Sequence, residues 1–109
     1  MRVKQTEKLV EFGVLINRIA EYQSKVPRNI VRQLNKHIKW LNANQNDAIF
    51  GKLITANLRV AEQVELYVKA RNAGDEMGAT EAKKKSEELW HLTELLANHI
   101  HREMMRSGV

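Results

Sequence analysis

Apolar residues recur at steps of three and four along almost the whole chain, the spacing that places them on one face of an α-helix. Four such stripes predict four helices, over about 6–24, about 27–42, from about 46 to about 72, and from about 80 to about 105. The stripes consist, in chain order, of Leu9, Phe12, Ile16 and Ile19; of Ile30, Val31, Leu34, Ile38 and Leu41; of Phe50, Leu53, Val60, Val64 and Tyr67; and of Leu89, Leu92, Leu96 and Ile100.

Three interruptions separate the stripes. Pro27 fits the first turn of a helix but not its interior, because it has no backbone N–H to donate. The segment NANQND, residues 42–47, favours a break in which Asn46 or Asp47 caps the third helix. The segment NAGDEMG, residues 72–78, is a loop, after which Thr80 is expected to cap the fourth helix.

These elements predict an all-α fold, an antiparallel four-helix bundle built from two αα-hairpins over about 4–44 and about 46–106. At 109 residues the chain is expected to form a single domain, residues 1–109. A segment beginning Phe12-Gly13 is partly repeated in a segment beginning Phe50-Gly51, and each copy is expected to open a helix that is followed by a loop and another helix. An old duplication and a chance similarity between amphipathic helices both explain the repeat. Glycine inside a helix indicates a close approach of another element.

Composition narrows the functional classes. The chain has no cysteine, which excludes disulfides and thiolate metal sites, and it has no apolar run long enough to span a membrane. No export signal is evident at the N-terminus, so a cytoplasmic location is expected. The formal net charge is +5, a balance that favours an anionic partner.

The most specific charged feature is a row of five cations at the second predicted helix: Lys25, Arg28, Arg32, Lys36 and Lys39. Steps of three and four place them on one narrow face, opposite the apolar stripe, with no acidic residue among them. Like charges four residues apart on a helix repel each other, and an anionic partner removes that repulsion. The row therefore predicts a surface for nucleic-acid phosphates or for an acidic protein. The alternative is a solvated face that Glu7, Glu11 and Glu21 of a neighbouring helix neutralise.

A second functional class is protein assembly. The first predicted helix has a wide apolar face that includes Val10, Leu15 and Tyr22, which leaves room for an interface between two copies of the chain. A homodimer or other interaction module is therefore the alternative expectation. Trp40 and Trp90 lie at the edges of their apolar stripes and are expected to serve packing rather than base stacking.

A third class is metal-dependent hydrolysis. Glu62 and Glu65 stand three apart on the third predicted helix, and Glu88 and His91 stand three apart on the fourth. Here the chain resembles the MazG-type all-α nucleotide pyrophosphohydrolases, whose motif is ExxE followed by ExxD. The resemblance implies a Mg²⁺ or Mn²⁺ site, but His91 replaces the aspartate and both pairs project away from the apolar stripes.

One further resemblance concerns DNA. Gly13, Ile16, Asn17, Ile19 and Ala20 are similar to a segment of the MobC-type plasmid-mobilisation accessory proteins, although positions 14, 15 and 18 depart from that pattern. The resemblance implies a function that involves DNA.

No nucleophilic catalytic site is evident, because serine occurs only at 24, 86 and 107 and no Ser–His–acid arrangement is apparent. We therefore assign no catalytic residue and no cofactor, and expect the chain to act by binding.

Overall fold

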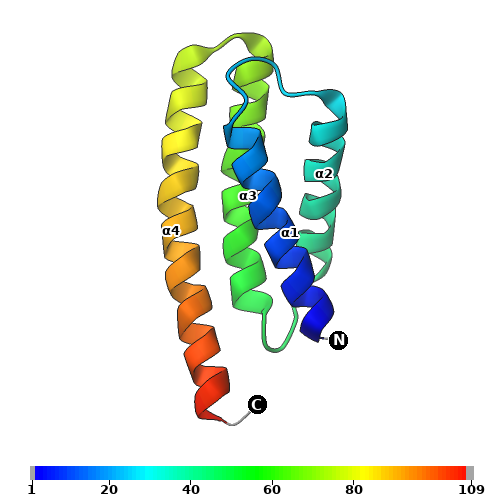
Figure 1. Ribbon diagram of the computed structural model, residues 1–109, viewed down its shortest axis with the longest axis vertical. Coiled ribbons are helices and arrows are strands. Elements are labelled where there is room, and N and C mark those ends of the chain that lie inside the picture. Colours follow the sequence, from blue (N-terminus) through cyan, green and yellow to red (C-terminus); the bar gives the residue numbers. More distant parts are fainter. Residues whose placement is uncertain (1, 108–109) are drawn as a thin grey trace.

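The structure is a computed structural model that describes residues 2–107, with side chains from Gln5 to Ser107. The described chain forms α1 (Arg2–Ala20), α2 (Arg28–Ala43), α3 (Gly51–Ala73) and α4 (Glu76–Arg106), and no strand. Successive helices run in opposite directions (Figure 1). The predicted all-α four-helix bundle is confirmed. None of the described helices combines the length and the apolar character that crossing a membrane requires.

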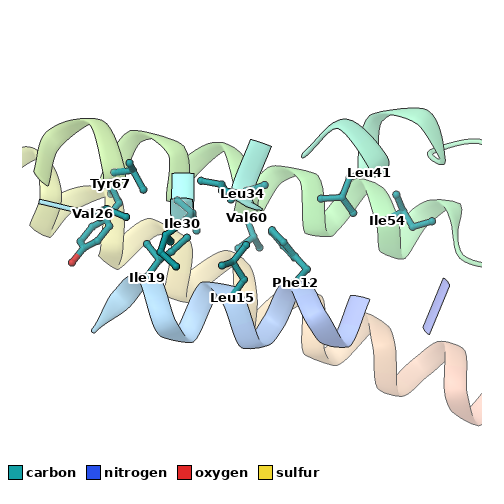
Figure 2. Close-up of a cluster of buried hydrophobic side chains, with 14 of the residues drawn as sticks. Phe12, Leu15, Ile19, Val26, Ile30, Leu34, Leu41, Ile54, Val60 and Tyr67 are labelled. Carbon is teal, nitrogen blue, oxygen red and sulfur yellow. The ribbon is translucent and has the colours of Figure 1, made fainter. Parts of the chain in front are cut away.

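Helix α3 is the centre of the bundle. It packs against all three other helices, most extensively against α4, and α2 and α4 lie on opposite sides of it (Figure 1). The reason is its composition, because α3 buries side chains such as Ile54, Val60 and Val64 on more than one face. Figure 2 shows Phe12 and Leu15 of α1 pointing toward this helix. Each fully buried side chain of this kind contributes about 1.5–3 kcal/mol.

Helix α4 differs from the sequence expectation in the way it packs. Its most buried residues are small: Ala79, Ala82, Ser86 and Thr93. Leu92, expected in the core, is 60% exposed. Small side chains let the backbones of α3 and α4 approach closely, so the contact follows those residues rather than the large apolar ones. The hydroxyls of Ser86 and Thr93 are satisfied within the helix by donating to the carbonyls of Lys83 and Leu89.

The three connections are fixed by side chains. Before α2, the Tyr67 hydroxyl donates to the Tyr22 carbonyl over 2.8 Å, and the Val26 N–H donates to Asn72 Oδ1 over 2.7 Å. Before α3, Asp47 Oδ1 accepts from the N–H groups of Ile49 and Phe50. Asp47 Oδ2 also accepts from Gln5 Nε2 over 2.8 Å, which ties α1 to that connection.

The connection before α4 corrects the predicted cap. Gly74 ends α3 with φ 74°, a left-handed conformation that glycine adopts without strain. Asp75 then caps α4, since its side chain accepts from the Gly78 N–H. Thr80 lies inside the helix, where its hydroxyl donates to the Glu76 carbonyl. The helix therefore begins at Glu76, four residues before the predicted start at about 80.

The two glycines of the repeat do not occupy equivalent places. Gly13 lies in the middle of α1, as expected, whereas Gly51 is the first residue of α3 and does not lie inside it. Each glycine nonetheless belongs to a helix that is followed by a connection and another helix, as the repeat predicts. Both glycines also accommodate a close approach. A Cβ at Gly13 would lie 3.2 Å from Cη2 of Trp90 on α4, and a Cβ at Gly51 would lie 2.6 Å from the Gln45 carbonyl oxygen.

Candidate nucleic-acid interface

The candidate interface is the outer face of α2, at one side of the bundle (Figure 1). On the opposite face of this helix, Ile30, Leu34 and Leu41 are buried against α1 and α3. Figure 2 shows these three side chains within the hydrophobic cluster. Because burial fixes the rotation of α2 about its axis, it also determines which residues face water.

All five predicted cations are exposed. Arg28, Arg32, Lys36 and Lys39 belong to α2, and at 100° per residue they fall within an arc of about 80°. Lys25 lies in the connection just before the helix. We refer to these five residues as the cationic stripe.

No described carboxylate lies within 4.0 Å of any cation of the stripe. The ion pairs among the described side chains are Lys8–Glu11, Arg71–Glu76 and Arg106–Glu103, all elsewhere in the molecule. Glu7, Glu11 and Glu21, the expected neutralising residues, therefore do not pair with the stripe. The structure supports the uncompensated arrangement over the neutralised one.

The surroundings of the stripe are polar and partly rigid. Asn29, Gln33 and Asn35 are exposed beside the cations and offer additional hydrogen-bond donors. The connection that carries Lys25 is held at two points, by Tyr67 and by Asn72 of α3. Sequence reasoning missed these two residues, because a single sequence gives no signal for contacts across 45 or 46 positions.

Two aromatic residues near the candidate interface serve packing. Trp40 of α2 is half-buried against the core, in agreement with the packing role expected of it. His37 is half-buried, and its ring lies 5.8 Å from the ring of Phe12 on α1, centroid to centroid. Burial lowers the pKa of His37, Glu11 opposes that shift, and Lys8 adds to it. The contact between α1 and α2 therefore favours the neutral form of the ring.

The residues of the alternative metal site, Glu62, Glu65, Glu88 and His91, are not gathered into a metal-binding cluster in the described part of the chain. Among the described residues, no three His, Asp or Glu side chains come together in a way that could hold a metal ion. Glu62, Glu88 and His91 are exposed, and Glu65 is half-buried. The cluster that the pyrophosphohydrolase reading requires is therefore missing from the part of the chain that the structure describes.

Comparisons with known proteins found no relative of this chain. The chain matches no protein-family model, no curated protein and no solved structure, so neither resemblance noted in the sequence gains support from a relative.

Proposed function

We propose that this protein binds the phosphate backbone of nucleic acid through the cationic stripe. The observation that carries the proposal is the exposure of Lys25, Arg28, Arg32, Lys36 and Lys39 without a carboxylate within 4.0 Å of any of them. A face of one charge sign raises the electrostatic energy of the unbound protein, and a polyanion lowers it.

The dimensions of the stripe suit a nucleic-acid strand. From Arg28 to Lys39 the helix rises by about 16 Å, at about 1.5 Å per residue. One strand of duplex DNA carries a phosphate every ~3.4 Å along the helix axis, so a row of this length passes about five phosphates. The row is therefore long enough for several of its cations to contact phosphates at the same time.

The N-terminus of α2 strengthens the positive end of the stripe. Pro27 precedes the helix without a side-chain cap, and the first turn contains no acidic residue. The partial positive charge of the helix terminus therefore adds to the charges of Lys25 and Arg28. Such contacts read the backbone and not the bases, so the binding is expected to depend little on sequence.

The proposal is tested by fluorescence anisotropy with a labelled 20-base-pair duplex and with the corresponding single strand. The variant Arg28→Glu/Arg32→Glu should abolish binding at low salt, because it replaces two attractive contacts with two repulsive ones. Both positions are exposed, so the far-UV circular dichroism should remain that of the wild type.

A matched control variant distinguishes the contribution of the cationic stripe to binding from the contribution of the overall net charge. Lys83→Glu/Lys84→Glu lowers the formal net charge of +5 by the same amount, at exposed positions on α4. This control should bind within about threefold of the wild type, as long-range effects between exposed charges are screened. Equal losses in both variants would mean that only net charge matters and would overturn the proposal. Failure of the wild type to bind either oligonucleotide at low salt would also overturn it and would leave an acidic protein as the stripe's partner.

A further inference from the structure

Helix α1 has a second apolar surface that the bundle does not use. Phe12, Leu15 and Ile19 are buried, whereas Val10 and Val14 point outward with 61% and 56% of their surfaces exposed. On a helix, positions four apart lie one above the other, so the two valines form a short ridge. An exposed pair of β-branched apolar residues has no role in the fold described above.

An apolar groove lies beside this ridge. Its walls are α1 and α4, its floor is the start of α3, and its volume is about 420 Å³. Gly13 on α1, Trp90 and Ala97 on α4, and Leu53 on α3 line it, and the two valines form its outer lip. The groove opens to solvent between α1 and α4.

Two opposite charges flank the ridge on the same face of α1. Glu7 lies before Val10, Arg18 lies after Val14, and at 100° per residue all four fall within an arc of about 80°. Both charged side chains are exposed, and neither has an opposite charge within 4.0 Å among the described residues. Along the helix, this face therefore carries a negative charge at Glu7, then the apolar ridge, then a positive charge at Arg18.

This order is self-complementary in one orientation. When two copies of α1 pair antiparallel about residue 12, Val10 of one copy lies at the same level along the helix axis as Val14 of the other. Glu7 then lies within one residue, about 1.5 Å of rise, of the level of Arg18 in the second copy. A parallel pairing would instead place Glu7 against Glu7. If the ridge of one copy enters the groove beside the ridge of the other, two-fold symmetry makes the reciprocal contact equivalent.

We propose that the protein forms a homodimer through α1, with Val10 and Val14 of each copy seated against the α1–α4 groove of the other. Two symmetry-related Glu7–Arg18 pairs set the antiparallel orientation. This interface lies on a face of the bundle other than the outer face of α2, so the inference is independent of nucleic-acid binding. A dimer would present two cationic stripes.

The test is sedimentation equilibrium of the full chain without nucleic acid, between about 10 µM and about 1 mM. The wild type should show a monomer–dimer equilibrium, and Val10→Glu/Val14→Glu should be monomeric throughout. The matched control is Leu92→Glu/Leu95→Glu, on a face of α4 that does not line the groove, with 60% and 53% exposure. It should dimerise like the wild type, because it introduces the same charges away from the interface.

A charge-exchange series tests the orientation even where the valine variant folds poorly. Arg18→Glu and Glu7→Arg should each weaken the dimer at least about threefold, since each makes both symmetric pairs repulsive. The combined Glu7→Arg/Arg18→Glu variant should recover dimerisation. Three results would each overturn the proposal. The first is a wild type that is monomeric at about 1 mM. The others are a folded valine variant that still dimerises and a combined variant that does not recover dimerisation.

Discussion

The indole ring of Trp90 on α4 lies against Gly13 on α1, so close that a Cβ at position 13 would meet its Cη2 atom at 3.2 Å. The contact joins two helices that otherwise touch little, since both pack mainly on other elements. Gly51 is more confined. A Cβ at that position would lie 2.6 Å from the Gln45 carbonyl oxygen, and a backbone atom cannot move aside as a side chain can.

Gly51→Ala should therefore destabilise the protein by about 1–3 kcal/mol, although alanine is the better helix former. Gly13→Ala is the control, because the edge of the half-buried Trp90 ring can shift by a few tenths of an ångström. Its effect should stay within about 1 kcal/mol of the wild type. Urea unfolding followed by circular dichroism measures both. A Gly51→Ala protein as stable as the wild type would contradict the close approach of the Gln45 carbonyl to Gly51.

Tyr67→Phe should destabilise the protein by about 1–2 kcal/mol. The buried Tyr67 hydroxyl donates to the Tyr22 carbonyl and accepts from Arg71 Nε over 3.0 Å, so its removal leaves two polar groups without this partner. Amide hydrogen exchange should become faster in the connection over 21–27, which this bond anchors. Unchanged exchange there would show that Asn72 alone holds the connection.

Acidification should destabilise the protein through His37. Its pKa is lowered in the folded state from the ordinary value of about 6.5, so below that pH the unfolded chain binds the proton more readily. The stability contributed by the neutral ring is therefore present above pH ~6.5 and is lost as the pH falls through the folded-state pKa. Lys8 and Glu11 are the charged groups that act on this ring.

Replacing His37 by Gln removes the titrating group and provides the comparison. Urea unfolding at several pH values from about 5 to about 8 should show a steeper loss of stability at low pH in the wild type than in the variant. Parallel pH profiles would mean that the other histidines or the carboxylates account for the acid sensitivity.

Much of the fold could be predicted because most apolar stripes face the core. Leu34 and Leu41 of α2 and Phe12 of α1 are buried as their spacing indicates. The prediction was wrong for Leu92, because the α3–α4 contact depends on small residues that carry no strong apolar signal. It was wrong for the start of α4, because Asp75 competes with Thr80 as a cap and the choice depends on the preceding turn.

Some features of the candidate site could likewise be predicted from the sequence, and others could not. The position of Arg32 or Lys36 follows from helical geometry once the buried face of α2 is known, so their exposure could be predicted from the sequence. The sequence could not predict whether a carboxylate from another helix would neutralise these cations, because that depends on how α1 packs against α2. The anchoring of Lys25 through Tyr67 and Asn72 likewise requires the tertiary structure.

The most direct test of the central claim is the salt dependence of duplex binding. The slope of log K against log salt concentration is about −0.9 per phosphate neutralised, so a stripe of four or five contacts should give a slope of about −4. Arg28→Ala/Arg32→Ala, which removes two contacts without adding repulsion, should reduce it to about −2. A wild-type slope near zero, or an unchanged slope in this variant, would contradict the claim that the outer face of α2 binds the phosphate backbone.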